Sequence, residues 1–135
     1  MTQITVQVTV NLDSKNVWEL WTNPKHIMNW NFASDDWECP YAKNDLRISG
    51  KFLFTMSAKD GSAKFDFEGT YSNMEKFKHI EYNIIDGRKV KIQFIPQQNA
   101  TKIIETFEIE KTNTEERQRG GWQAILDNFK KYAEK

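Results

Sequence analysis

The sequence predicts an α+β fold in which a curved antiparallel sheet wraps around a long C-terminal helix. Residues 4–10 alternate between apolar and polar side chains, and the same period of two returns between Asp45 and Ile109. An apolar stripe of helical period follows from Trp122 to Ala133. Because the sheet and the helix each have one apolar face, packing one on the other buries both. We expect one domain over residues 1–135.

The first third of the chain predicts a strand, two short helices and a loop. The β-branched residues of segment 4–10 favour a strand with one buried face. Asp13 or Ser14 can cap a first helix, and Asn23-Pro24 supplies a cap and a first helical residue for a second one. Residues 31–44 have no period and many polar groups, so we expect a long loop there.

The remaining elements are a six-stranded antiparallel meander and the long helix. Asp60-Gly61 and Asp86-Gly87 are typical hairpin turns between alternating segments. One strand face is aromatic and the other is charged, which indicates a sheet covered on one side. Asn113, with Glu116 three residues later, predicts a capped start for the C-terminal helix.

The composition excludes several functional classes. The 135 residues are 39% hydrophobic and 13% aromatic, enough for a core. Lys+Arg and Asp+Glu number 19 each, so the net basic charge that nucleic-acid binding favours is missing. No apolar run approaches the ~20 residues of a membrane span. The first residues lack a basic-then-apolar leader, and we expect a cytoplasmic protein without membrane insertion.

Motifs for metal binding or nucleophilic catalysis are missing from the sequence. Cys39 is the single cysteine, so it cannot form an internal disulfide, and we expect an inert thiol. His26 and His79 lack the ligand spacing of a zinc site. Asp35-Asp36 lies in a polar loop and is typical of a turn. We therefore expect neither a metal nor a cofactor.

Several segments carry a resemblance to a known family. They are residues 30–37, 44–47, 56–62, 65–71, 86–88 and, most specifically, 118–129, the segment QRGGWQAILDNF. Through them the chain resembles the START-like (SRPBCC) superfamily, and most closely the homologues of the activator of the heat-shock protein 90 ATPase. The resemblance implies a helix-grip fold with an internal cavity. It also implies a small apolar molecule as partner and, through the name of the family, a chaperone as a second candidate partner.

The aromatic residues on the inward face leave two interpretations open. They either fill a core or form the wall of a cavity for an apolar ligand. On the assigned strand phases, Phe65 and Phe129 also point inward. The residues that we expect to bind the ligand are Phe52, Phe54, Phe67, Tyr71, Tyr82, Phe94, Glu105, Phe107, Gln118, Gly121, Trp122 and Ile125, gated by Trp30 and Trp37.

The aromatic rings of Trp30 and of segment 31–44 allow two interpretations, of which a gate is one. Large rings in a polar loop are unusual unless they pack on something. They form a lid over the cavity or a plug that folds back on one end of the core, and the two roles are compatible.

Gly121 and Glu105 are the two most informative residues of this set. A glycine inside a helix costs about 1 kcal/mol relative to alanine. Gly121 either leaves space between helix and sheet or marks a late helix start or a kink. Glu105 shares its strand phase with apolar neighbours, so an inward carboxyl must pair or take up a proton. A bulge would instead place it in solvent. Its candidate partners are Arg47, Tyr82 and Gln118.

Three functions follow, in order of preference. The first is binding of a small apolar or amphipathic molecule in the cavity. The second is a protein-interaction module that regulates a chaperone ATPase through its exterior. The third is a cyclase- or hydrolase-like enzyme with Glu105 as general acid or base, which the lack of a nucleophile–base pair disfavours. An exposed edge strand would allow a homodimer, and a monomer is the alternative.

Overall fold

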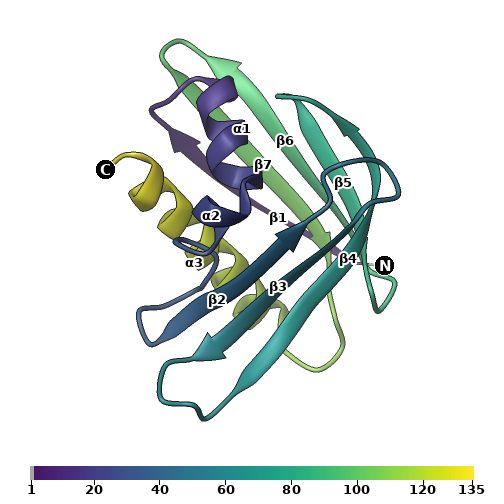
Figure 1. Ribbon diagram of the computed structural model, residues 1–135. Coiled ribbons are helices and arrows are strands. Elements are labelled where there is room, and N and C mark those ends of the chain that lie inside the picture. The colour runs from purple at the N-terminus through teal and green to yellow at the C-terminus, as the bar shows by residue number, and fades with distance from the viewer. Residues whose placement is uncertain (1) are drawn as a thin grey trace.

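A single antiparallel sheet of seven strands is the framework of the computed structural model, which describes residues 2–135 (Figure 1). The strand order is β1-β7-β6-β5-β4-β3-β2, so β2 to β7 form a meander and β1 adds beside β7. The elements are β1 (Gln3–Val10), α1 (Ser14–Thr22), α2 (Pro24–Ile27), β2 (Trp37–Asn44), β3 (Lys51–Ala58), β4 (Lys64–Glu75), β5 (His79–Ile84), β6 (Lys89–Gln97), β7 (Ala100–Glu108) and α3 (Glu115–Ala133).

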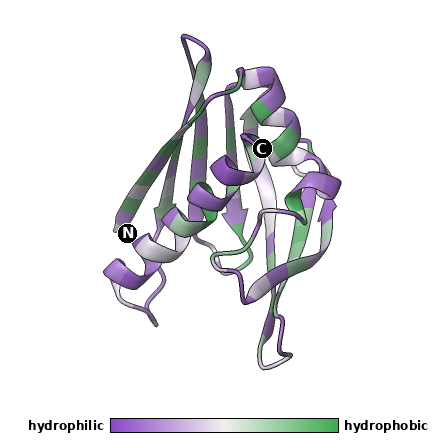
Figure 2. Ribbon diagram, turned by 90° about the vertical axis from the view of Figure 1, so that its left-hand side faces the viewer, coloured by the Kyte–Doolittle hydropathy of each residue, from purple (hydrophilic) through white to green (hydrophobic). Residues whose placement is uncertain are grey.

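The long helix α3 lies across the inner side of the curled sheet (Figures 1 and 2). At one end α1 joins it, because the Trp21 ring packs edge-on against Phe94 of β6 and Phe129 of α3, at 5.8 and 4.9 Å between centroids. Phe94, Phe107 and Phe129 are fully buried. This arrangement confirms the predicted α+β, helix-grip architecture.

Local signals place most element boundaries where the sequence predicts them. Asp13 caps α1 by accepting a hydrogen bond from the Asn16 backbone N–H at 2.8 Å. Asn23 caps α2, and Pro24 is the first residue of that helix. Gly61 and Gly87 have φ values of +80° and +96°, the left-handed conformation that glycine adopts without strain. Both hairpin predictions are confirmed.

The expected loop at residues 31–44 is wrong in its second half, which forms strand β2. This strand pairs with β3 and supplies the first strand of the meander. Its register shifts between Glu38 and Tyr41, with Pro40 between them. The shift breaks the alternation by which strands are recognised, and most side chains of this edge strand are only partly covered.

The predicted cap of α3 is displaced by one residue. Thr114, not Asn113, is the N-cap, and its Oγ1 accepts from the Arg117 backbone N–H at 3.1 Å. The Asn113 backbone N–H instead donates to the Glu110 carboxylate at 2.6 Å. Two adjacent residues can both cap a helix, and this contact with the preceding loop distinguishes them.

Side chains of α3 cover the outer edge of β1. Arg119 donates to the Thr5 carbonyl oxygen at 3.1 Å, and Gln123 donates to the Gln7 carbonyl oxygen at 3.0 Å. Lys130, about two turns further along α3, donates to the carbonyl oxygen of Thr9. Thr5, Gln7 and Thr9 are every second residue of β1, so their carbonyl groups point to the same side. Three outward carbonyl oxygens of this edge strand are therefore hydrogen-bonded within the chain.

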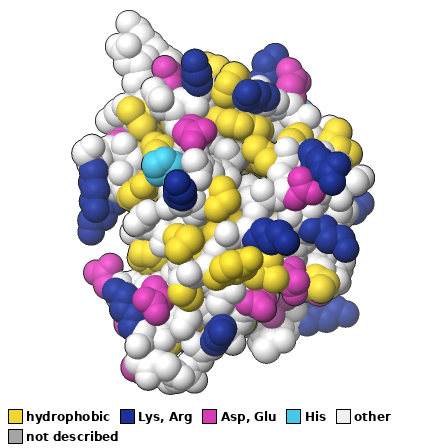
Figure 3. Space-filling view, viewed as in Figure 1, with side chains coloured by type: hydrophobic (Ala, Val, Ile, Leu, Met, Phe, Trp, Pro, Cys, Tyr) yellow, Lys and Arg dark blue, Asp and Glu magenta, His cyan; other side chains and the backbone are white. Residues whose placement is uncertain are grey.

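Charged side chains of both signs are mixed on the surface. On the face seen in Figure 1, lysines and arginines lie among aspartates and glutamates, with hydrophobic side chains between them (Figure 3). This distribution agrees with the net charge of zero.

Candidate functional site

A cavity of about 570 Å³ lies between the inner face of the sheet and α3. Its wall is built by side chains from the meander, from α3 and from the segment after α2. Small-molecule sites have volumes of roughly 300–1,000 Å³. Asn113 and Arg117 are exposed members of the lining, so the cavity opens to solvent at the N-terminal end of α3. The aromatic residues therefore surround space instead of filling it.

Most of the residues expected at the site lie in this lining. They share an inward position on β3, β4, β5, β7 or α3, with Trp30 following α2. The Phe52 ring is the centre of their packing, at 5.0 Å from Phe54 and 4.8 Å from Tyr82. The members of the expected set that line the cavity are Trp30, Phe52, Phe54, Phe67, Tyr71, Tyr82, Glu105, Gln118, Gly121, Trp122 and Ile125.

Three residues of the expected set lie outside the lining. Phe94 packs against Trp18 and Trp21, at 5.6 and 5.8 Å, and belongs to the solid core beside α1. Phe107 is covered by the Trp122 ring, which stacks on it at 4.1 Å. Trp37 is partly exposed on β2 and packs against Phe65. The alternation along a strand predicts which side chains point inward. It does not predict whether another side chain separates them from the cavity.

Trp30 is buried and hydrogen-bonded at one end of the core. Its side chain is 3% exposed, and its indole N–H donates to the Leu20 carbonyl oxygen at 3.0 Å. Its ring lies 4.7 Å from Trp21 and 4.9 Å from Phe129. The ring therefore lies where the plug interpretation places it, at one end of the core.

Gly121 faces open space. A Cβ atom at Gly121 would meet no heavy atom within 4 Å, and the residue lines the cavity. Because α3 begins at Glu115, the alternative of a helix that starts at Gly121 is wrong. Gly69 has the opposite reason for lacking a side chain, since a Cβ there would lie 2.6 Å from the Phe52 ring.

Glu105 points inward, as its phase predicts. It pairs in register with Val6 and Ile92, so the alternative of a bulge is wrong, and its side chain is 5% exposed. Among residues 2–135 no group donates a hydrogen bond to its carboxyl, and burial raises the pKa of this carboxyl to about 8. The group therefore carries a proton at neutral pH.

None of the three expected partners pairs with Glu105. The Gln118 amide is engaged elsewhere, because it accepts from the Glu110 backbone N–H and donates to the carbonyl oxygens of Glu110 and Asn113. Arg47 pairs with Asp45 in an exposed position. Tyr82 lines the cavity without a hydrogen bond to the carboxyl.

The buried carboxyl predicts that stability falls as pH rises. The folded protein holds the Glu105 proton up to about pH 8, whereas the unfolded chain releases it near 4.5. Between these values the folded state binds more protons, so the free energy of unfolding decreases by up to about 1.4 kcal/mol per pH unit. Glu105→Gln removes this contribution. Urea denaturation of both proteins from pH 5 to 9 measures the free energy of unfolding at each pH. If this free energy depended on pH equally in wild type and Glu105→Gln, the result would contradict a buried acid.

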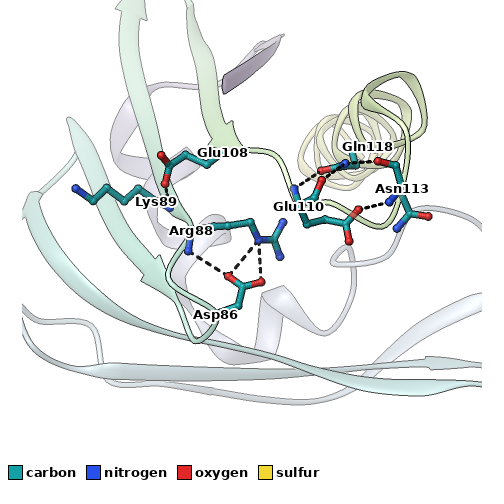
Figure 4. Close-up of polar contacts among 7 residues, drawn as sticks. All are labelled: Asp86, Arg88, Lys89, Glu108, Glu110, Asn113 and Gln118. Carbon is teal, nitrogen blue, oxygen red and sulfur yellow. Dashed lines mark hydrogen bonds and ion pairs between the residues drawn. The ribbon is translucent and has the colours of Figure 1, made fainter. Parts of the chain in front are cut away.

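A polar network frames the solvent opening (Figure 4). Arg88 lies in the β5–β6 turn, and its Nε donates to the Asp86 carboxylate at 2.9 Å. Glu110, in the loop between β7 and α3, is joined to α3 through Gln118. Figure 4 shows the Arg88 guanidinium between Asp86 and the loop that contains Glu110. The opening is therefore polar and held by hydrogen bonds, in contrast with the aromatic interior.

A second polar contact lies between Tyr71 and Asn44. The Tyr71 hydroxyl donates to Asn44 Oδ1 at 2.5 Å, and Asn44 Nδ2 donates to the Thr22 carbonyl oxygen at 2.8 Å. Burial raises the pKa of Tyr71 above its ordinary value. Tyr71 is therefore a neutral, already satisfied part of the wall.

Sequence reasoning missed a further set of lining residues. Met56, Ile80 and Ile92 share the inward phase of their strands and were recognisable from it. Phe65 also has an inward phase, on β4, and most of the others come from edge-strand, turn, loop or helix-end positions that carry no periodic signal. The additional lining residues are Trp21, Thr22, Asn31, Ala33, Asn44, Met56, Phe65, Ile80, Arg88, Ile92, Glu110, Asn113 and Arg117. Phe65 lies at an outer part of the wall, where it is 50% exposed.

The other reactive side chains have structural surroundings. Cys39 is buried, and burial raises the pKa of its thiol to about 11, which disfavours the reactive thiolate. His26 Nδ1 lies 2.7 Å from the Tyr132 hydroxyl, a contact between α2 and α3. Within residues 2–135, no cluster of three or more His, Cys, Asp or Glu side chains is arranged to hold a metal ion. None of the described helices is long and apolar enough to span a membrane.

Comparison with known proteins places these features in a family. The family model described as "Activator of Hsp90 ATPase homolog 1-like protein" matches residues 11–134. An AHSA1-like protein from Aeromonas hydrophila, solved by NMR, is 40% identical with a TM-score of 0.93, over 98% of this chain and 92% of that one. A protein from Cytophaga hutchinsonii is 50% identical with a TM-score of 0.85, over the same shares.

More distant structures share only the fold. A crystal structure from Chromobacterium violaceum has a TM-score of 0.89 at 18% identity, over 100% of this chain and 99% of that one. A search of curated proteins finds no match.

Proposed function

Because this chain belongs to the activator of Hsp90 ATPase homolog 1-like family, whose fold is known for ligand binding, we propose that it binds a small apolar or amphipathic molecule between α3 and the sheet. The observation that carries the proposal is the cavity of about 570 Å³ with a wall that is mainly apolar and rich in aromatic rings. Burial of apolar ligand surface contributes about 25 cal/mol per Å² removed from water.

Two features support a ligand site over a packing defect. The helix carries a glycine at a lining position where a Cβ would meet no heavy atom within 4 Å, although alanine would favour the helix by about 1 kcal/mol. The solvent opening is framed by hydrogen-bonded polar groups, which give an amphipathic molecule a route and a place for its polar end.

Extraction and mass spectrometry of the purified protein test this function. We expect a small apolar or amphipathic molecule, stoichiometric with the chain, that is released by organic solvent. The stripped protein is then screened by thermal shift against neutral and charged amphiphiles. Those that bind should raise its melting temperature, because ligands that prefer the folded state stabilise it. An empty extract together with no shift from any amphiphile would contradict the proposal.

A further inference from the structure

We infer that Glu105 and Tyr82 form a hydrogen-bonding subsite inside the cavity for a neutral oxygen function, a hydroxyl or carbonyl group, of the ligand. The inference rests on the proposed function and specifies its ligand class. That class is a neutral amphiphile whose oxygen lies deep in the cavity, as opposed to a fatty-acid anion or an alkylammonium cation.

The two side chains are buried, unpartnered and in the cavity wall. Glu105 is 5% exposed and Tyr82 is 7% exposed, and both line the cavity. Neither side chain has a hydrogen bond to any group within residues 2–135, and no fully enclosed side-chain N or O atom in that range lacks a partner. The oxygens of Glu105 and Tyr82 therefore keep accessible surface, which lies toward the cavity. A ligand group is the partner that such a site lacks.

Both groups are neutral donors at neutral pH. Burial raises the pKa of Glu105 to about 8, and it raises that of Tyr82 well above its ordinary value. A protonated carboxyl and a phenol offer one O–H donor each and keep acceptor lone pairs. A hydroxyl or carbonyl oxygen can accept from both, and a hydroxyl can also donate to either. This complementarity favours a neutral oxygen.

An anionic ligand group fits this subsite poorly. A carboxylate beside Glu105 would add a second buried acid without a cation to balance it. Arg88 is near enough to lower the pKa of Tyr82, but its guanidinium is bound to Asp86 at the opening. Arg117, the other cation of the lining, is exposed. Both arginines of the lining therefore lie at the opening, where Asp86 and Glu110 accompany Arg88, and neither lies beside Glu105.

A cationic group fits poorly as well. An ammonium ion has three donors to satisfy, and the subsite supplies two oxygen-bearing side chains next to apolar Ile80 and Ile92. Forming the ion pair would remove both charges from water, a cost that the attraction of a single pair often fails to recover.

Three probes of equal chain length distinguish these ligand classes: 1-decanol, decanoate and decylamine. Their affinities are measured at pH 7 by displacement of a fluorescent apolar dye. We expect wild-type protein to bind decanol at least about ten-fold more tightly than either ion, the effect of one buried hydrogen bond without an unpaired charge. Glu105→Gln should keep this preference, and Glu105→Leu should reduce it to about two-fold. From pH 7 to 9.5, the affinity of 2-decanone, whose carbonyl oxygen can only accept, should fall for wild type and remain constant for Glu105→Gln.

The possible failures separate this inference from the proposed function. Equal binding of the three probes, tighter binding of decylamine or decanoate, or an unchanged preference in Glu105→Leu would overturn the subsite while leaving cavity binding intact. Failure of the dye and of all three probes to bind wild type would contradict the proposed function itself. Circular dichroism and melting temperatures of both variants establish that the compared proteins are folded.

Discussion

Replacement of Gly121 by phenylalanine is expected to weaken ligand binding by about ten- to a hundred-fold while the protein stays folded. The new side chain would project from α3 into the cavity, since a Cβ there meets no heavy atom within 4 Å. A ring in space that the ligand needs costs about 1–3 kcal/mol through overpacking, which corresponds to that range of Kd. The helix itself gains, because phenylalanine has a higher helix propensity than glycine.

Gly120→Phe is the matched control for this variant. Gly120 precedes Gly121 in the same helix, and a Cβ atom there would likewise meet no heavy atom within 4 Å. Gly120 is, however, exposed to solvent and lies outside the cavity lining, so the two variants undergo the same chemical change on different sides of α3. Isothermal titration with the extracted ligand, or with decanol, measures the difference. Equal affinities in the two variants would show that the ligand binds elsewhere.

Phe129→Ala is expected to be the most destabilising of the substitutions considered, at about 3–5 kcal/mol. The Phe129 side chain is fully buried and packs edge-on against Trp21 and Trp30, at 4.9 Å from each. Its removal leaves a cavity where α1, α3 and the segment after α2 meet. Since domains have a total stability of about 5–15 kcal/mol, the variant loses a large part of it. Urea denaturation measures the loss.

Phe65→Ala makes the same truncation at a ring that is 50% exposed. We expect a loss of about 1 kcal/mol or less, because surface substitutions rarely cost more. The two variants compare the same truncation at a packed position of the core and at a half-exposed position of the cavity wall. A Phe129→Ala protein as stable as Phe65→Ala would contradict the packing described between α1 and α3.

The periodic elements were predictable from the sequence because one face of each is buried. Strict alternation predicts β1 and most of the meander, and the stripe from Trp122 to Ala133 predicts α3. The inward direction of Glu105 follows from the same physics, since it occupies the buried phase of β7. The open space beside Gly121 was indicated by the sequence, because a glycine inside a helix is unfavourable unless its missing side chain serves a purpose.

Features that depend on three-dimensional contacts were not predictable in this way. Strand β2 is a half-covered edge with a register shift, so its alternation is broken. Phe94 and Phe107 have the inward phase, but α1 and Trp122 cover them, which a strand pattern does not encode. The residues of the solvent opening come from three separate segments, joined only by folding. Arg88 and Glu110 are examples, from the β5–β6 turn and the β7–α3 loop.

The contacts of α3 with the rim of β1 bear on how the molecule behaves at high concentration. Fibril growth and strand exchange start where a sheet can accept one more chain, and Arg119, Gln123 and Lys130 already occupy those acceptors on β1. At the opposite rim, Pro40 lacks the amide hydrogen that an incoming strand would need. The same helix that encloses the cavity thus also disfavours the addition of a further strand at the β1 edge.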